Sequence, residues 1–264
     1  MLASPHSLVP WLALVMLCAC AAPPVDWTAN GAIRFDGRPI ALAADGTIRP
    51  DSVQLRAHTP APSPVCAGSV QVARSRSKLF AAWWAPRADS GAVLMASRSD
   101  DEGASWQAAV AVDTTDRSVA GCGRTPPAIA ADSVSGYVHV TYALRAREGP
   151  GLFFSHSMDG GITFHSPVPI LYGERLGRTS VAADGDRVAV AFEDPSSAAP
   201  RVGLALSRTM GHLFEQRILP VSDDHGAASH PLVAVSGNRI AVAWREGADS
   251  AAGITLRTRR GTIH

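Results

Sequence analysis

The stretch "SRSDDEGASW", residues 97–106, decides the fold because it returns twice further along the chain. "SHSMDGGITF" (155–164) repeats its serine, aspartate, glycine and closing aromatic at the same offsets, and "LSRTMGHLF" (206–214) is a degraded copy with Thr209 in place of the aspartate. The copies lie 58 and 50 residues apart, which indicates a structural array or propeller. The shared positions are Ser99, Asp101, Gly103 and Trp106, then Ser157, Asp159, Gly161 and Phe164, then Ser207, Gly211 and Phe214.

Alternating strand-like segments flank each copy and end in an aromatic residue, namely Trp83, Tyr142, Phe192 and Trp244. Period-two alternation with Gly, Asp and Ser between the segments predicts short antiparallel strands. In the second unit the four strands are expected at 126–132, 137–143, 151–157 and 163–170. A fourth unit begins near His230 and runs to the end with three strands. Four short strands per unit describe a propeller blade, so we predict an all-β fold of four-stranded antiparallel blades.

The motif Ser-x-Asp-x-Gly-x-Thr/Ser-Trp/Phe resembles the Asp-box, or BNR repeat, of sialidase-like β-propellers. The resemblance covers about residues 64–264 and implies the fold more specifically than any activity. Propellers of that family usually have six blades, whereas four units are recognisable here. Ring closure is left open: residues 31–44 supply the missing outer strand of the last blade, or residues 27–60 form a further partial blade.

The first residues predict export. "LVPWLALVMLCACAA" (8–22) is an apolar signal-peptide core, and "LCAC" resembles a bacterial lipobox with Cys20 as the lipidated residue. Ordinary cleavage after Ala22 is the alternative. The expected organisation is a signal peptide at 1–19, an N-terminal segment and linker at 20–63, and the propeller at 64–264. The protein is then a membrane-anchored lipoprotein of the bacterial cell envelope.

Two cysteines remain after the signal, Cys66 and Cys122. In an oxidising compartment they are expected to form a disulfide, with free thiols or metal ligation as the weaker alternatives. The formal net charge of +1 and the absence of basic runs exclude nucleic acid as an expected partner. No cofactor is expected. The groups Asp223, Asp224, His225 and His230 match no tight metal spacing, so no metal site is predicted.

The repeated turn itself is expected to be structural. Its Ser and Asp oxygens accept hydrogen bonds from the turn amides, and its aromatic ring packs between blades. In a four-stranded blade this turn lies between the third and fourth strands, which directs the search for function to the opposite face.

The residues on that opposite face suggest an anion-binding site. Inner-strand arginines there resemble the arginine cluster that binds the sialic acid carboxylate, a role suited to a bidentate donor. The candidate ligand-binding residues are Arg124, Arg178, Arg145, Glu193, His230 and Arg245. A sialidase would also need a tyrosine nucleophile, its base and an acid, for which Tyr172, Glu174 and Asp116 are the candidates.

Three functions are compatible with the sequence. The first is a propeller that binds a glycan or another anionic ligand, the second an active exo-sialidase-type hydrolase, and the third a scaffold that binds other envelope proteins. The Phe/Tyr-Arg-Ile-Pro motif of the resembled enzymes is absent, and the chain has three tyrosines, so binding is favoured over hydrolysis. Fold alone does not decide among them.

Overall fold

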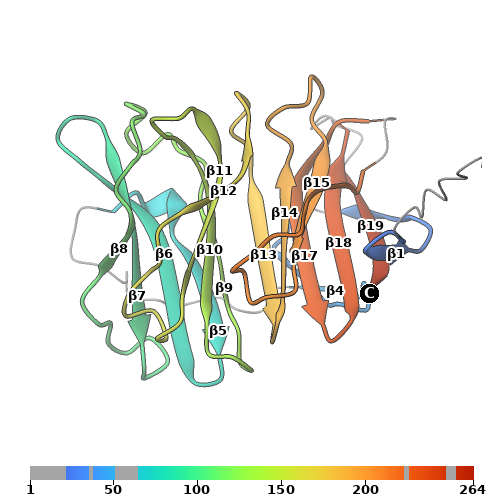
Figure 1. The fold of residues 1–264 in the computed structure, drawn as a ribbon, viewed down its shortest axis with the longest axis horizontal. Helices are drawn as coiled ribbons and strands as arrows, with labels where there is room; N and C mark the ends of the chain where they lie inside the picture. The colour runs from blue at the N-terminus through green and yellow to red at the C-terminus, as the bar shows by residue number, and fades with distance from the viewer. Residues whose placement is uncertain (1–21, 36–37, 51–64, 223–225, 248–253) are drawn as a thin grey trace, which may run out of the picture.

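A computed structural model describes residues 22–35, 38–50, 65–222, 226–247 and 254–264. Four antiparallel sheets stand side by side, in chain order across the molecule (Figure 1). Each begins at an inner strand and meanders outward through short hairpins. This radial repetition of four-stranded sheets is a β-propeller arrangement, as the sequence predicted.

The first three sheets are complete four-stranded units made from consecutive strands. Their strands are β5 (Gln71–Ser75), β6 (Lys78–Pro86), β7 (Ala92–Ser99) and β8 (Val110–Asp113); β9 (Ala128–Ala131), β10 (Val138–Arg145), β11 (Pro150–Ser157) and β12 (Val168–Tyr172); and β13 (Thr179–Asp184), β14 (Arg187–Glu193), β15 (Val202–Ser207) and β16 (Gln216–Pro220).

The fourth sheet takes its outer strands from the N-terminal segment. It contains β17 (Ala228–Ser236), β18 (Arg239–Glu246) and β19 (Ile254–Ile263). Strands β1 (Val25–Trp27) and β2 (Gly31–Phe35) both pair antiparallel with β19, at its two ends. A start-to-end pairing of this kind supplies the outer strand that the C-terminal unit lacks.

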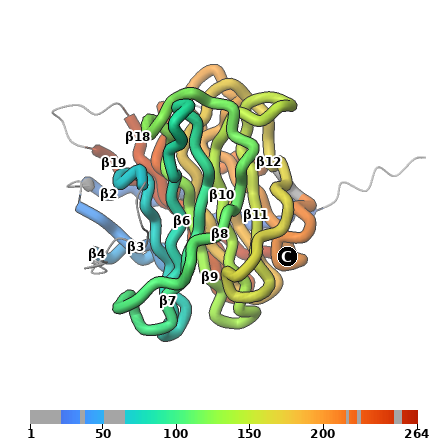
Figure 2. The backbone as a smooth tube through the Cα atoms, turned by 90° about the vertical axis from the view of Figure 1, so that its left-hand side faces the viewer, coloured from blue at the N-terminus to red at the C-terminus, as the bar shows by residue number. Residues whose placement is uncertain are grey.

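A separate two-stranded hairpin follows, formed by β3 (Ile40–Leu42) and β4 (Ile48–Pro50). Its first strand contacts β17 and β18, and the hairpin lies on the side of the sheets opposite β12 (Figure 2). In the described part of the chain no strand pairing joins the first sheet to the fourth. The described sheets therefore form a row whose inner strands contact each other from β5 to β9 to β13 to β17.

Three apolar clusters hold the row together, one at each interface between neighbouring sheets. Large aromatic side chains lie in them: Trp84 and Tyr142 between the first two sheets, Phe192 between the next two, and Trp244 between the last two. In the first unit this residue is Trp84 and not the expected Trp83, which belongs to none of the three clusters. All four side chains are at most 1% exposed. Burying large rings in this way supplies much of the apolar stabilisation of such a domain.

One loop connection is covalently fixed. Cys66, beside the short 3-10 helix Ala67–Ser69, forms a disulfide with Cys122, as expected from the cysteine count. Within the described residues, no helix is long and apolar enough to cross a membrane. Cys20 and the predicted signal peptide lie outside the described residues.

Candidate functional site

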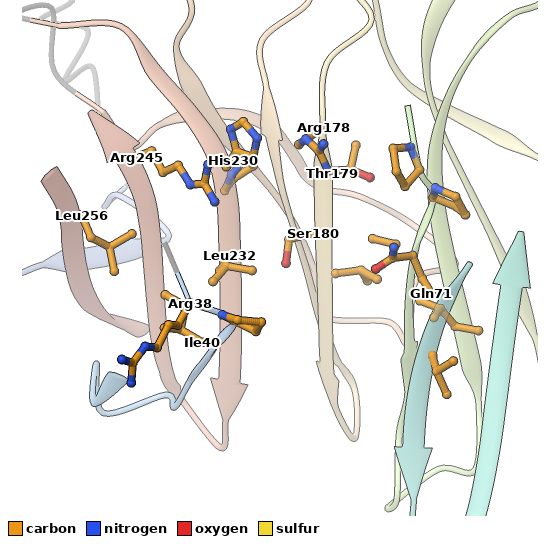
Figure 3. Close-up of a pocket in the computed structure, with 18 residues that line it drawn as sticks. Arg38, Ile40, Gln71, Arg178, Thr179, Ser180, His230, Leu232, Arg245 and Leu256 are labelled. Carbon is orange, nitrogen blue, oxygen red and sulfur yellow. The ribbon is translucent and has the colours of Figure 1, made fainter. Parts of the chain in front are cut away.

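A central cavity of about 440 Å³ lies where the inner strands of all four sheets meet (Figure 3). Each sheet contributes residues near the beginning of its inner strand, and the segment before β3 contributes the remaining wall. The polar lining residues are Arg38, Gln71, Arg178, Thr179, Ser180, His230 and Arg245. The sequence placed Arg178, His230 and Arg245 on one face, and the structure brings these three to one cavity.

Arginines are the charged residues among the described lining of this central cavity. Arg38, Arg178 and Arg245 line it, and among its described lining residues there is no aspartate or glutamate. The nearest acid of β18, Glu246, is paired with Arg257 at 2.5 Å. A concave site with one sign of charge and apolar walls favours a ligand of opposite charge.

Arg178 is the side chain most available to a ligand. It precedes β13 and is exposed, and its guanidinium makes no hydrogen bond or ion pair with any residue that the structure describes. Its backbone is fixed instead, because the Arg178 amide donates to Glu193 Oε2 at 3.1 Å and its carbonyl accepts from the Glu193 amide at 3.0 Å. The Arg178 backbone is thus fixed, while its guanidinium group remains available to bind a planar anion.

Glu193 connects two inner strands below the arginine. Its second oxygen, Oε1, accepts a hydrogen bond from the His230 amide at 2.8 Å. This carboxylate therefore positions the two residues, and both of its oxygens are used for backbone amides. The sequence suggested Glu193 as a ligand-binding residue; in the structure its carboxylate accepts hydrogen bonds from the Arg178 and His230 backbone amides.

His230 adopts a backbone conformation that a side-chain-bearing residue rarely takes. Its φ is +52°, at a register shift of β17 between Ser229 and Leu232. Left-handed backbone at a non-glycine residue costs free energy and is concentrated at functional sites. The conformation directs the His230 ring toward the Arg178 and Arg245 end of the cavity (Figure 3).

Arg124 does not share this cavity, contrary to its predicted pairing with Arg178. Its side chain is only 5% exposed, and Nε donates to Asp116 Oδ2 at 2.6 Å. The guanidinium also donates to the carbonyls of Gly121 and Ser118 and lies 5.8 Å from the Trp84 ring centroid. The Cys66–Cys122 disulfide lies two residues before this arginine in the chain.

Asp116, the candidate general acid, is the partner of that arginine. Its side chain is 1% exposed. Besides the ion pair, Oδ1 accepts the amides of Ser118 and Arg145 at 3.1 and 3.2 Å. Both carboxylate oxygens of Asp116 therefore accept hydrogen bonds from protein groups, and the side chain is covered rather than presented to a ligand.

The other candidate catalytic residues also lie away from the central cavity. Tyr172 ends the edge strand β12 and is 44% exposed, facing a different hollow near the outer rim. Glu174 is exposed and forms a 3.5 Å ion pair with Arg145. Tyr172 and Asp116 do line the same outer hollow, but Arg178 does not.

The repeated turns share one hydrogen-bond arrangement. Ser99 Oγ donates to Asp101 Oδ1 at 2.7 Å and accepts the Gly103 amide at 2.7 Å, and Ser157 does the same with Asp159 and Gly161. Hydrogen bonds from the Ser105 hydroxyl and amide, and from Ser99, lower the pKa of Asp101 to about 2.

The third turn keeps the serine contacts without an aspartate. Ser207 Oγ accepts the Gly211 amide at 3.1 Å, and Thr209 Oγ1 accepts the Leu213 amide at 2.9 Å. The closing rings pack inward: Phe214 is 5% exposed and meets Phe154 edge-on at 4.9 Å, while Trp106 and Phe164 are half-buried. In all three copies the turn side chains are occupied by the turn itself.

The sequence did not anticipate a histidine cluster near these turns. His139 is fully buried with neither ring nitrogen hydrogen-bonded, and His156 stacks on His165 with ring centroids 4.8 Å apart. Burial and the neighbouring His156 lower the pKa of His139 to about 3, and burial with His212 and His165 lowers that of His156 to about 4. The alternation pattern predicted the strands but not this cluster, because His139 of β10 and His156 of β11 occupy buried positions where apolar residues are expected.

A second missed feature is a buried tyrosine–carboxylate bond. Tyr142 donates its hydroxyl proton to Asp113 Oδ2 at 2.7 Å, which ties the second sheet to the outer strand of the first. Burial, and then the charge of Asp113, raises the pKa of this hydroxyl well above its usual value.

Three of the four residues considered as metal ligands, residues 223–225, lie outside the part of the chain that the structure describes. Within the described part, no three His, Cys, Asp or Glu side chains are grouped so that they could hold a metal ion.

The comparisons with known proteins bear on the fold. No protein-family model matches the chain, and no curated protein matches it. Among solved structures, a protein of unknown function from Dyadobacter fermentans is 17% identical, with a TM-score of 0.53 over 71% of this chain and 50% of that one.

Two sialidases are also similar in structure, at lower TM-scores. The Hadza microbial sialidase Hz136 gives 0.47 at 17% identity, covering 74% of this chain and 46% of its own. The NanB sialidase from Streptococcus pneumoniae gives 0.49 at 13% identity, covering 74% and 30%. The chain thus spans half or less of these proteins, and likeness at such identities concerns the fold and not the activity.

Proposed function

We propose that this protein is an exported, lipid-anchored propeller that binds an anionic ligand, such as an acidic glycan, in its central cavity. Arg178 is the proposed carboxylate contact, with His230 and Arg245 beside it. The observation that carries the proposal is the Arg178 guanidinium, which has no partner among the described residues and lines a cavity whose described lining residues include no aspartate or glutamate.

Binding is favoured over glycoside hydrolysis on the placement of the candidate residues. Tyr172 and Asp116 line the outer hollow, and Asp116 is neutralised by Arg124. A retaining sialidase needs its nucleophile and acid at the sugar that the arginines hold. A purely scaffolding role would be better served by a flat or apolar face than by a cationic cavity.

The test is a calorimetric titration of the purified full chain with 3′-sialyllactose, using lactose as the neutral counterpart. A hydrogen-bonded charge pair contributes about 1.5–3 kcal/mol, so Arg178→Gln should weaken sialyllactose binding by roughly 10-fold to 150-fold. The matched control is Arg175→Gln, an exposed arginine three residues earlier that does not line the cavity.

Equal effects of the two substitutions would reduce the interaction to general charge attraction and contradict the proposal. A fluorogenic sialoside provides the second readout. Turnover that disappears in Tyr172→Phe would establish hydrolysis in place of binding.

A further inference from the structure

A second hollow, which we call the outer groove, lies between the outer edges of the first and second sheets. It measures about 660 Å³ and is lined by residues 114–117 after β8, by residues 146–148 of the β10–β11 turn, and by β12 with Pro167. It shares no lining residue with the central cavity. We propose that the outer groove binds an acidic sugar unit, carboxylated or sulfated, independently of the central cavity.

Tyr172 provides the surface for a sugar ring. Phe153 meets it edge-on with centroids 6.0 Å apart, which fixes the ring from the buried side. The strand beside it has no side chain at Gly151, where a Cβ would come within 3.1 Å of Tyr172 Cδ1. The ring is held closely on one side and remains 44% exposed on the other. A fixed aromatic ring with one accessible face suits the apolar face of a pyranose.

Arg117 and Arg147 provide the charge. Both are exposed, both line the outer groove, and neither guanidinium makes a hydrogen bond or ion pair with a residue in the described ranges. The other charges there largely cancel, because Arg87 pairs with Asp89 at 2.9 Å and Asp116 with Arg124 at 2.6 Å.

Glu148 is the remaining acid of the groove, so two arginines face one glutamate. The forked donors of two arginines match the planar oxygens of a carboxylate or the three oxygens of a sulfate.

The edge strand itself disfavours a peptide as the occupant. β12 is the edge of its sheet, and Pro167 and Pro169 border the groove there. Proline has no amide proton and is found on edge strands with its nitrogen facing out. An extended peptide adding to this edge would therefore lack donors that strand addition requires.

The experiment isolates the outer groove by using Arg178→Gln as the background. The probes are trigalacturonic acid for a carboxylate, a heparin tetrasaccharide for a sulfate, and maltotriose as the neutral control, each titrated into the purified full chain. We expect at least one acidic probe to bind and maltotriose not to bind. Tyr172→Ala and Arg147→Gln should each weaken that binding at least 10-fold, whereas Arg175→Gln, which lines neither cavity, should leave it unchanged.

Three results would overturn the inference. One is the absence of binding by both acidic probes on this background. Another is an equal loss in Arg175→Gln, which would show unspecific charge attraction. The third is binding of an oligoaspartate peptide in place of either sugar, which would make the groove a protein-docking site. Thermal unfolding of each variant shows whether it is folded, and the exposed positions of Tyr172 and Arg147 predict unchanged midpoints.

Discussion

Removing the carboxylate of Asp116 should destabilise the protein strongly while leaving ligand binding in the central cavity intact. The Asp116→Ala change leaves the Arg124 guanidinium buried without its counter-charge, since the two side chains are 1% and 5% exposed. Breaking a buried ion pair from one side costs about 3–5 kcal/mol. Arg124 retains the carbonyls of Gly121 and Ser118 and its position beside Trp84, so we expect the lower end, about 3 kcal/mol.

Urea unfolding followed by tryptophan fluorescence measures this effect. With a urea dependence of about 3 kcal/mol per molar for a chain of this size, the midpoint should fall by about 1 M. Two controls accompany it. Asp116→Ala combined with Arg124→Met should recover much of the loss, because no charge is left buried. Asp89→Ala removes an exposed ion pair with Arg87 and should move the midpoint far less.

A urea midpoint of Asp116→Ala within about 0.3 M of the parent protein would contradict this expected loss of stability. So would a variant that stays equally stable but loses ligand binding or sialoside turnover. Loss of binding or of turnover would indicate that Asp116 acts in the functional site, as the sequence suggested.

Three further predictions concern pH, the repeated turn and the disulfide. In the folded protein the pKa values of His139 and His156 are lowered to about 3 and about 4, so below pH 6.5 the unfolded chain binds more protons than the folded one. The free energy of unfolding should therefore fall from pH 6.5 toward pH 4 by about 1.4 kcal/mol per histidine and pH unit. Replacing His139 by Phe should reduce this slope, as measured by urea unfolding at a series of acid pH values. Gly211→Ala should lower the melting midpoint more than Gly136→Ala. Both glycines have a positive φ, of 86° and 78°, but only at Gly211 would the added Cβ lie 2.5 Å from the Phe154 ring. Equal shifts of the two midpoints would contradict the packing described at Gly211. Cys122→Ser should cost about 4 kcal/mol on a chain-entropy basis for a 56-residue separation, and a midpoint insensitive to this change would show that the loop is held by other contacts.

The repeat made most of the fold predictable. Period-two alternation located β10 and β11 within one or two residues, and the recurring turn fixed their direction. The fourth strand of that unit was expected at 163–170 but is Val168–Tyr172. The reason is local: Thr163 still bonds to Asp159 and the His165 amide to His156, so the turn occupies these residues.

The candidate site was only partly predictable, because contacts distant in sequence decide which arginine is available. Arg124 and Arg178 both follow a glycine and precede a threonine in the sequence. Arg124 is bound by a carboxylate eight residues away, whereas Arg178 lines the cavity. The outer strands of the last sheet come from more than 200 residues away, as the 2.8 Å bond from the Thr28 amide to the Arg260 carbonyl illustrates. The missing strand of the last unit indicated residues 31–44 as one source, and β2 within them does pair with β19, but local pattern could not decide between this pairing and a further partial blade.

The most direct measurement is a crystal structure of the protein soaked with 3′-sialyllactose. Our account predicts the sugar carboxylate in the central cavity, with its oxygens about 2.8 Å from the Arg178 guanidinium and the His230 and Arg245 side chains adjacent. A carboxylate bound elsewhere, or a ligand seated in the cavity with its carboxylate directed away from Arg178, would contradict it.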